Sequence, residues 1–371
     1  MPALAVACKT NFLREHSMLA LIVQPGKPGS TRLEERSEPE ISEGTLLVQA
    51  LAVGICGTDR EIIQGHYGSA PPGQEYLVLG HESIGRVLEA PGDSGFSAGD
   101  LVVGIVRHPD PVPCTNCVVG EWDMCRNGRY TEHGIKQLHG FCAERFRIEP
   151  EFAIKLDPAL HRVGVLLEPA SIVAKAWEHI EHIGRRARWE PRRVLITGAG
   201  PIGLLAAMMG VQRELEVRVL DRMIEGPKPT LVRDLGAKYY SSGIEVACSD
   251  ADVVLECTGA GQLVFDAIRY TGPGGIVCLT GLSSGKRVLE ADIAALNRSM
   301  VLENDVVFGS VNANRRHYVA AAEALARVDL DWLERLITRR VPLVRWEEAL
   351  TPQPRDVKTL IDLTFGVSLC S

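Results

Sequence analysis

The sequence contains no apolar stretch long enough to cross a membrane, which takes about 20 residues in a helix. The nearest candidate, residues 194–211, is interrupted by four glycines and one proline. The sequence also has no excess of positive charge, because its net charge at pH 7 is -7. These two absences argue against a membrane protein and against nucleic acid or an anionic membrane surface as a partner.

A secretory signal is missing as well. Residues 1–17 contain Lys9, Arg14 and Glu15 and lack the continuous apolar core of a signal peptide. We therefore expect a cytoplasmic protein in which residues 1–17 are an N-terminal extension and the globular pattern starts at Met18. Ten cysteines are many for such a protein, and clustered cysteines in a cytosolic chain indicate metal binding before disulfides.

Length and composition are those of a folded protein with two domains. The 371 residues are enough for two hydrophobic cores, with 46 % hydrophobic and 23 % charged residues. In the first half, short apolar runs such as 45–53 alternate with glycine and proline, which predicts a partly open β domain. After residue 221 strand and helix patterns alternate, which predicts a parallel sheet covered by helices on both faces.

One stretch has the pattern of a dinucleotide-binding unit. Residues 194–197 predict a buried strand, residues 204–212 a helix and residues 217–220 a second strand. The turn before the helix reads GxGxxG and consists of Gly198, Ala199, Gly200, Pro201, Ile202 and Gly203. Its glycines allow a tight turn, close approach of the backbone to a pyrophosphate, and close packing of helix on strand. The alternative is a glycine-rich turn that only connects core elements.

The acid after the second strand bears on the choice of cofactor. Asp221 stands about 20 residues beyond the glycines, where a carboxylate accepts the hydroxyls of an adenosine ribose. A carboxylate there repels the 2′-phosphate of NADP, whereas the neighbouring Arg222 can pair with that phosphate. We therefore expect NAD as the cofactor, with NADP as an alternative.

Four residues outside this stretch are candidate metal ligands. Cys56, His81 and Glu82 each follow a predicted strand, and Glu168 lies in an apolar run that opens a helix. Thiolate, imidazole and carboxylate are ligands of zinc in proteins, and an isolated buried carboxylate is costly unless it is paired or bound to metal. The alternative is a buried free cysteine, a hydrogen-bonded histidine and an ordinary acid in the first turn of a helix.

A second candidate metal site is a lobe with three cysteines. Cys114 and Cys117 form a CxxC pair, a spacing that lets two sulfur atoms bind one ion, and Cys125 follows eight positions later. A closed structural zinc site needs four ligands, and Asp110 is the nearest acid upstream. The alternative is a set of three free thiols in a lobe that has lost its metal.

These motifs, in this order, resemble those of the zinc-dependent medium-chain alcohol dehydrogenase family. The resemblance covers nearly everything after Met18, and finer features are similar to the glucose dehydrogenase branch of the family. The segments that carry it are 54–59, 80–82, the cysteine lobe, 167–169 and the GxGxxG turn for the family, and 56–62, 77–83, 132–135, 139–141 and 311–312 for the branch.

The resemblance implies an α/β fold with two domains. A mostly-β, GroES-like catalytic domain would span residues 18–170 and be completed by residues 313–371. A Rossmann domain with a doubly wound parallel sheet would span residues 171–312 and bind the nicotinamide cofactor. The family also implies a homodimer or homotetramer.

The resemblance implies a catalytic zinc ion held by Cys56, His81 and Glu168. Glu82 would be a nearby acid that ligates zinc in some states, and Thr58 would contact the substrate and start a proton relay. The implied catalytic group comprises Cys56, Thr58, His81 and Glu82, and Glu168 is also implied at the substrate.

Further roles are implied for residues that are more dispersed along the chain. Glu132 and Asn312 would hold hydroxyls of a sugar. Lys358 would reach the nicotinamide late in the chain. Loops along the cofactor would contain Thr258, Leu279, Thr280, Gly281, Ser310 and Val311, in addition to the GxGxxG turn, Asp221 and Arg222.

Two positions depart from the family pattern. Pro111 stands where the cysteine lobe of relatives has its fourth cysteine, so a structural zinc ion held by Cys114, Cys117 and Cys125 stays open. Val106 stands where relatives place an asparagine near the substrate, so the preferred sugar is also open.

The implied reaction is the zinc-assisted oxidation of an aldose, such as D-glucose, at C1 to the aldonolactone, with hydride transfer to NAD(P). Two alternatives remain at this stage. One is a polyol or secondary-alcohol dehydrogenase of the sorbitol or threonine type on the same scaffold. The other is a nucleotide-binding protein that has kept the fold and lost catalysis.

Overall fold

The computed structural model describes residues 17–283 and 288–364. The predicted extension at residues 1–17 lies outside these ranges except for Ser17, which is already the first residue of a strand and pairs with Ser37. The chain forms two compact units, which we call the β unit (residues up to Glu168 and from Arg339) and the α/β unit (Pro169–Thr338).

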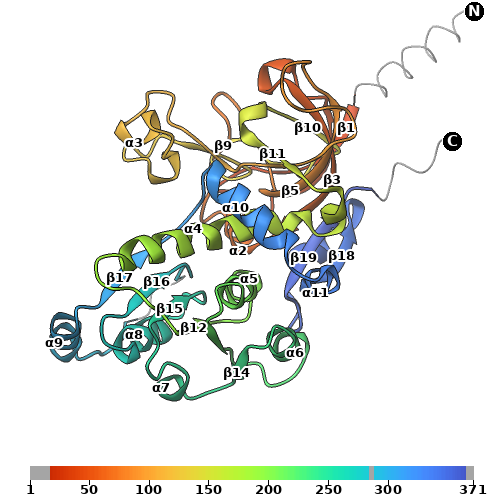
Figure 1. Ribbon diagram of the computed structural model, residues 1–371. Helices are drawn as coiled ribbons and strands as arrows, with labels where there is room; N and C mark the ends of the chain where they lie inside the picture. Colours follow the sequence, from red (N-terminus) through yellow and green to blue (C-terminus); the bar gives the residue numbers. More distant parts are fainter. Residues whose placement is uncertain (1–16, 284–287, 365–371) are drawn as a thin grey trace, which may run out of the picture. The chain divides into compact units, whose positions relative to one another are not determined.

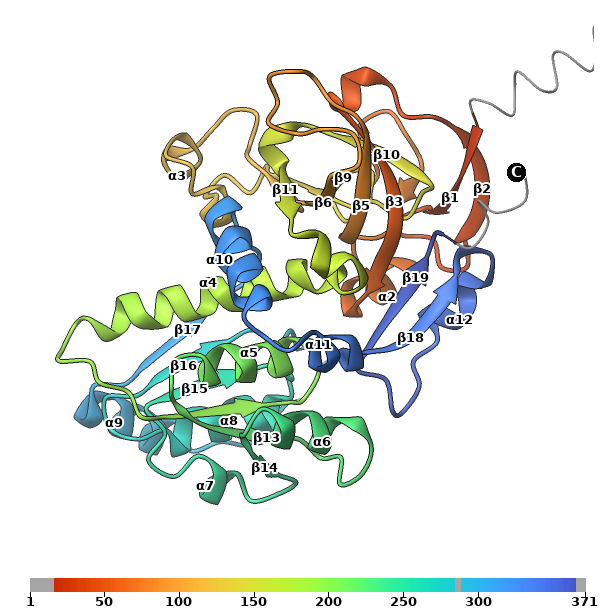
Figure 2. The same cartoon turned by 45° about the vertical axis from the view of Figure 1, so that its right-hand side comes forward.

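The β unit is built around one seven-stranded sheet (Figure 2). Its central strand, β3, has antiparallel neighbours from three distant parts of the sequence, namely β5, β10 and β19. Two three-stranded sheets, β2-β1-β4 and β7-β8-β9, complete the unit. Its helices and strands are β1 (Ser17–Val23), β2 (Arg32–Ser37), β3 (Leu46–Ile55), α2 (Gly57–Ile63), β4 (Leu77–Val78), β5 (Glu82–Glu89), β6 (Leu101–Gly104), β7 (Arg107–His108), α3 (Thr115–Val118), β8 (Thr131–His133), β9 (Gln137–Leu138), β10 (Arg145–Ile148), β11 (Ala153–Leu156), β18 (Ile337–Pro342), α12 (Trp346–Leu350) and β19 (Lys358–Asp362).

The α/β unit contains a six-stranded sheet in which every pair of neighbours is parallel (Figure 1). The strand order is β14-β13-β12-β15-β16-β17, which is the 3-2-1-4-5-6 order of a doubly wound dinucleotide-binding sheet. This confirms the predicted fold of the second domain. Its elements are α4 (Leu167–Gly184), β12 (Arg193–Thr197), α5 (Pro201–Val211), β13 (Glu216–Leu220), α6 (Pro227–Asp234), β14 (Lys238–Tyr240), α7 (Ile244–Ala247), β15 (Val253–Glu256), α8 (Gly261–Tyr270), β16 (Ile276–Leu279), α9 (Ile293–Glu303), β17 (Val306–Gly309), α10 (Arg315–Ala326) and α11 (Leu330–Leu336).

Helices cover both faces of this parallel sheet. On one face, α5 approaches so closely that a Cβ at Gly210 would lie 3.0 Å from Val217 and 3.4 Å from Val194. On the other face, Leu195 and Val254 belong to a buried cluster with residues of α7 and α8. Because side chains alternate along a strand, strands buried on both faces are apolar throughout, as the sequence of β12 indicated.

The α/β unit ends later than the predicted Rossmann domain, which stopped at residue 312. Helix α10 packs within this unit, where Arg316 pairs with Glu178 of α4 and the Ala324 carbonyl accepts from Gln212. Helix α11 also belongs to it, because the Trp332 indole donates to a carbonyl of α6. The chain therefore joins the β unit only at β18. Among the described residues, no helix is long and apolar enough to span a membrane.

Candidate metal and cofactor sites

Three predicted metal ligands meet in the β unit. Cys56 directly follows β3 as the N-cap of α2, His81 precedes β5, and Glu82 is the first residue of β5. One potential ligand atom from each lies within 4.8 Å of the other two, and the Cys56 sulfur is 3.1 Å from Nε2 of His81. His81 and Glu82 are buried, at 4 % and 2 % exposure.

Two glycines make room for this cluster. A Cβ at Gly54 would lie 2.0 Å from the Glu82 carboxylate, so only glycine leaves space for that side chain. Gly80 has a φ of +87° directly before His81, and a Cβ there would lie 2.5 Å from Val53. A half-buried thiol beside a buried imidazole and a buried carboxylate, in a space kept open by glycine, fits a zinc ion, because these groups are common zinc ligands.

Asp59 contacts both Cys56 and His81 of this cluster, and it was not assigned a role from the sequence. It is fully buried, and its Oδ1 lies 3.4 Å from Nδ1 of His81, while its Oδ2 accepts a hydrogen bond from the Cys56 amide. Burial raises the pKa of Asp59, but the charge and hydrogen bonds of His81 and the Cys56 amide outweigh it and lower the pKa. A carboxylate on the far nitrogen of a ligating histidine fixes the ring orientation. The sequence signal is the N-cap to N3 spacing of Cys56 and Asp59.

Lys358 lies beside the cluster of Cys56, His81 and Glu82. It is 2 % exposed on β19, and its ammonium group binds both carboxylate oxygens of Glu82, with 2.6 Å to Oε1, and the Ile55 carbonyl. Burial alone lowers the pKa of Lys358, but the charges of Glu82 and Cys56 raise it above its usual value. Glu82 is thus neutralised locally, and the predicted contact of Lys358 with the nicotinamide stays a prediction.

Glu168 lies in the first turn of α4 and is 6 % exposed. It is not one of the three residues whose ligand atoms lie within 4.8 Å of each other, in a comparison restricted to the described ranges. Burial raises its pKa to about 7, opposed by His81 and Lys358 and assisted by Glu82. Thr58, the second residue of α2, donates its amide to the Cys56 sulfur at 3.2 Å.

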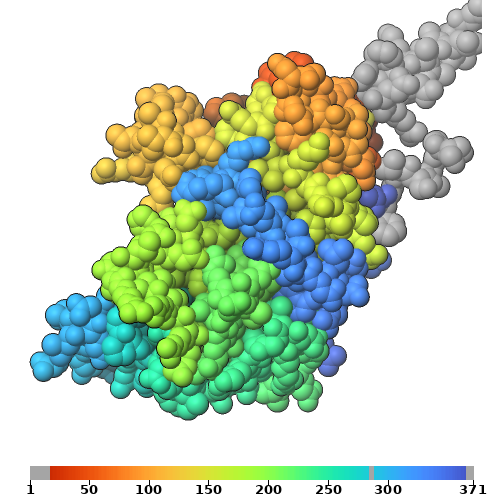
Figure 3. Space-filling model, in the orientation of Figure 1, coloured from red at the N-terminus to blue at the C-terminus, as the bar shows by residue number. Residues whose placement is uncertain are grey.

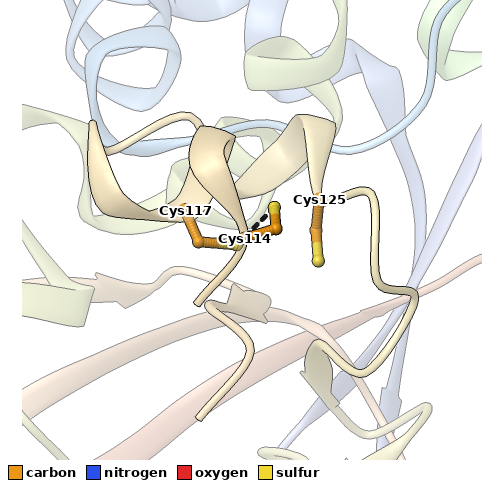
Figure 4. Close-up of side chains that lie close together, drawn as sticks. All are labelled: Cys114, Cys117 and Cys125. Atoms are coloured by element: carbon orange, nitrogen blue, oxygen red, sulfur yellow. Dashed lines mark hydrogen bonds between the residues drawn. The ribbon is translucent and has the colours of Figure 1, made fainter. Parts of the chain in front are cut away.

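The three cysteines of the lobe also converge (Figure 4). Cys114 is the N-cap of α3, and Cys117 lies within α3. The sulfur atoms of these two residues and of Cys125 all lie within 4.8 Å of one another. The Cys114 and Cys117 sulfurs are 3.6 Å apart. Asp110 is committed elsewhere, because its carboxylate accepts from the Val112 amide and from the side chains of Asn127 and Arg129.

The glycine turn of the α/β unit has the predicted geometry. Gly198 has a φ of +87°, and a Cβ at Gly203 would lie only 1.8 Å from the Gly198 carbonyl oxygen. Gly200 caps α5, followed by Pro201 and Ile202 in its first turn. The turn borders a pocket of about 640 Å³ at the carboxyl ends of the strands, where parallel sheets bind ligands.

Asp221 and Arg222 line this pocket, but Asp221 already has partners. Its carboxylate accepts from the amides of Ala199 and Met223 and lies 3.1 Å from the ammonium group of Lys228. Burial raises the pKa of Asp221, whereas these hydrogen bonds and Lys228 lower it below its usual value. Lys228 was not singled out in the sequence, because it lies beyond the strand, on α6.

The remaining predicted cofactor residues lie at the ends of β15, β16 and β17. A buried carboxylate, Glu256, organises two of these ends: it accepts from the amides of Thr258 and Gly259, and its carbonyl accepts from the Thr280 hydroxyl. Glu256 was not predicted from the sequence, although it stands two residues before Thr258. The others are Leu279, Gly281, Ser310, Val311 and Asn312. Leu279 ends β16, and a Cβ at Gly281 would lie 2.2 Å from the amide nitrogen of Gly259. The Val311 carbonyl accepts from Lys175, and Asn312 has a φ of +63°.

The fold and the two sites define a class: two-domain, zinc-type dehydrogenases that use a nicotinamide cofactor. Comparisons with known proteins identify the family. The family model "Alcohol dehydrogenase GroES-like domain" matches residues 42–158, and the model "Glucose dehydrogenase C-terminus" matches residues 161–363. The chain therefore belongs to the zinc-type medium-chain dehydrogenase family, in its glucose dehydrogenase branch, which confirms the predicted family and fold class.

Relatives match over nearly the whole chain. The glucose 1-dehydrogenase of Methanocella arvoryzae is 40 % identical, and glucose 1-dehydrogenase 1 of Caldivirga maquilingensis is 39 % identical; each match covers 93 % of this chain and 99 % of the relative. The structure of Haloferax mediterranei glucose dehydrogenase in complex with NADP, Zn and gluconolactone has a TM-score of 0.86 and 31 % identity, and covers 93 % of this chain and 99 % of its own.

Proposed function

We propose that this protein is a glucose 1-dehydrogenase. It oxidises an aldose, such as D-glucose, at C1 to the aldonolactone and transfers the hydride to NAD(P). The observation that carries the proposal is the convergence of the half-buried Cys56 with the buried His81 and Glu82 in a chain of the glucose dehydrogenase branch. The complex of the Haloferax relative with NADP, Zn and gluconolactone supports the same reaction.

The residues of the β unit hold the metal and handle the proton. Cys56, His81 and Glu168 would hold a zinc ion, with Glu82 as a ligand in some states, and Asp59 keeps the imidazole of His81 oriented. When bound, zinc supplies Lewis acidity that lowers the pKa of a hydroxyl at its open position. The hydroxyl of Thr58 accepts the proton released by the sugar, and Glu132 holds sugar hydroxyls.

The residues of the α/β unit hold the cofactor. The amides at the start of α5 would hold the pyrophosphate, and Asp221, which lines the same pocket, would hold the adenosine ribose. Thr258, Thr280 and their neighbours would line the cofactor at the carboxyl ends of the strands, and Asn312 would hold a sugar hydroxyl near the nicotinamide. The bound nicotinamide supplies the hydride acceptor.

We also propose a homodimer or homotetramer. The sheet of the α/β unit ends at β17, and the neighbouring helix α9 buries none of its residues (Figure 3, pale blue). Ile293, Val301 and Leu302 of this helix are 63–67 % exposed. Apolar side chains gathered on one exposed helix favour a protein partner, and a second copy of the chain satisfies that need.

Three further assignments remain proposals. The cofactor domain is residues 171–312 and the catalytic domain is residues 18–170 with 313–371, of which residues 313–338 pack with the α/β unit. The cysteine lobe would hold a structural zinc ion through the sulfurs of Cys114, Cys117 and Cys125 together with a fourth ligand. The protein is cytoplasmic, in keeping with the absence of disulfides among the eight cysteines that the structure describes.

One assay tests the proposed reaction. Reduced nicotinamide is followed by absorbance with D-glucose, D-galactose, D-xylose, sorbitol and threonine, each with NAD and with NADP. We expect turnover of one or more aldoses, and no turnover of sorbitol or threonine at comparable concentrations. A preference for sorbitol or threonine would replace the proposal by a polyol or secondary-alcohol dehydrogenase, and cofactor binding without any turnover would refute it.

A further inference from the structure

A buried ion pair stands at the predicted sugar-binding carboxylate. Arg107 of β7 and Glu132 of β8 face each other directly in the antiparallel pairing of these strands. Their side chains are 7 % and 2 % exposed. Arg107 has no role in the proposed reaction.

The guanidinium group of Arg107 is held on three sides. Its Nε donates to Oε1 of Glu132 at 3.0 Å, and a terminal nitrogen lies 2.9 Å from the same oxygen. Its other terminal nitrogen donates to the carbonyl of Asp123, in the short turn between Cys117 and Cys125. Its plane lies over the ring of Tyr130, 3.6 Å from the centroid.

The turn after Glu132 also fixes the backbone of this residue relative to the cluster of Cys56, His81 and Glu82. The amide of Lys136 donates to the Glu132 carbonyl, and the Glu132 amide donates to the Lys136 carbonyl. Gly134, inside this turn, has a φ of +71°, and a Cβ there would lie 2.4 Å from the carbonyl oxygen of Gly80. Gly80 directly precedes His81, so the backbone that carries Glu132 packs against the backbone that carries a metal ligand.

We propose that Arg107 is a positioning residue for Glu132. It holds one carboxylate oxygen in a fixed place, so that the carboxylate receives sugar hydroxyls at a defined position relative to the metal. This inference rests on the proposed function, because it takes Glu132 as a sugar contact. It also links the cysteine lobe to substrate binding, because the Asp123 carbonyl is one of the three supports of Arg107.

Arginine is required here for its shape as well as its charge. Its planar group donates in two directions at once and stacks on an aromatic ring, whereas a lysine ammonium is a compact point charge on a flexible stem. Arg107→Lys therefore keeps the positive charge beside Glu132 and removes the fork and the stacking on Tyr130. It changes the position of the Glu132 carboxylate without leaving it unpaired.

The experiment uses four variants of the full-length, zinc-loaded protein: Arg107→Lys, Glu132→Gln, the double variant, and Arg218→Lys. Arg218 is a matched control, because its Nε binds Glu216 at 2.9 Å and a terminal nitrogen binds the Ser249 carbonyl, but it lies on β13 of the α/β unit. For each variant kcat, KM for the sugar, KM for the cofactor, zinc content and thermal unfolding are measured.

We expect Arg107→Lys to raise KM for glucose about tenfold, with kcat, cofactor KM and zinc content nearly unchanged. Because Arg107 acts through Glu132, the double variant should be no worse than Glu132→Gln alone. Arg218→Lys should leave KM for glucose unchanged. Strictly additive effects of Arg107→Lys and Glu132→Gln on KM, or an effect confined to thermal unfolding, would overturn the inference.

Failure of the proposed function gives a different result. If Glu132→Gln has no effect on KM for glucose, Glu132 is not a sugar contact, although the enzyme still oxidises glucose. If the unaltered protein oxidises no aldose, the proposed function itself is wrong. The inference about Arg107 fails alone when Glu132→Gln raises KM and Arg107→Lys does not.

Discussion

At the scale of single residues, Asp59 decides how well His81 is presented to a metal ion. Asp59→Asn keeps the shape and the hydrogen bond from the Cys56 amide but removes the negative charge from Nδ1 of His81. We expect zinc affinity or turnover to fall about 10- to 100-fold, as for other partners of ligating histidines. Zinc content by atomic absorption and kcat with glucose measure this. Asp100→Asn is the control, since that acid pairs with Lys155 at the surface, and an equal loss there would contradict the expectation.

Lys228 is the residue that most changes the expected choice of cofactor. Its ammonium group lies 3.1 Å from the Asp221 carboxylate and lines the same pocket, so it offsets the charge that repels a 2′-phosphate. We expect Lys228→Ala to lower kcat/KM for NADP about tenfold, or about 1.4 kcal/mol, relative to NAD. Steady-state kinetics with both cofactors measure the ratio. Lys238→Ala removes an exposed ion pair with Glu216 of comparable length and should leave the ratio of NADP to NAD activity unchanged. An unchanged ratio in Lys228→Ala would show that Arg222 alone admits the phosphate.

At the scale of elements, two glycines of the α5 turn have separable roles. A Cβ at Gly203 would lie 1.8 Å from the Gly198 carbonyl oxygen, whereas a Cβ at Gly200 meets nothing within 4 Å and its φ is -80°. Gly203→Ala should therefore destabilise the protein by about 1–3 kcal/mol through overpacking. Gly200→Ala should leave thermal unfolding unchanged and weaken NAD(P) binding about tenfold, because its methyl group points to where a pyrophosphate approaches. Equal unfolding temperatures for the two variants would contradict this.

The sheet β7-β8-β9 and its surroundings carry histidines that are held neutral. Burial lowers the pKa of His108 to about 2 and that of His133 to about 4, while in the unfolded chain a histidine titrates near 6.5. The unfolded state therefore binds more protons below pH 6.5, so stability is complete above that pH and falls as the pH falls. Each such histidine contributes about 1.4 kcal/mol per pH unit between its two pKa values.

Replacing one of these histidines tests the effect. His108 stacks on Phe152 with the ring centroids 3.6 Å apart, so His108→Phe keeps an aromatic ring and removes the titrating group. Urea unfolding at pH 7, 6 and 5 should give a shallower loss of stability in this variant than in the unaltered protein. Parallel curves would contradict the neutral state of His108.

At the scale of the whole molecule, local patterns predicted the fold, while the assignment of the zinc ligands stays a prediction. The parallel sheet of the α/β unit was predicted from alternating strand and helix patterns, which are local signals, and its doubly wound form from the resemblance to the family. The convergence of Cys56, His81 and Glu82 was predicted because each follows a strand. Partners from distant parts of the chain were not predictable: Lys358 and Glu82 are 276 positions apart, and nothing near either residue indicates the other.

The boundary between the units was also beyond the sequence. Helix α10 has an ordinary amphipathic pattern, which fits either domain equally well. Its place in the α/β unit depends on particular pairs, such as Arg316 with Glu178. Likewise, the support of Glu132 by Arg107 depends on strand pairing between β7 and β8, two elements too short to give a periodic signal.

The two sites lie in different units, which predicts that metal and cofactor binding can be separated. Cys56, His81 and Glu82 belong to the β unit, and every residue that lines the 640 Å³ pocket belongs to the α/β unit. Removal of zinc with 1,10-phenanthroline should abolish glucose oxidation and leave the dissociation constant of the reduced cofactor, measured by its fluorescence, within about threefold. Cys56→Ser should behave like the metal-free protein, without disturbing the cysteine lobe.

Gly200→Ala supplies the reverse case, with zinc retained and cofactor binding weakened, because its methyl group lies at the nucleotide turn. Together the two variants distinguish a site that needs the metal for chemistry from a fold that needs it for stability. If metal removal both lowered the unfolding temperature and released the cofactor, zinc would support the fold. If turnover persisted in the metal-free protein, zinc would have no part in the reaction. Zinc measured per chain before and after Cys56→Ser separates the catalytic ion from an ion bound by Cys114, Cys117 and Cys125.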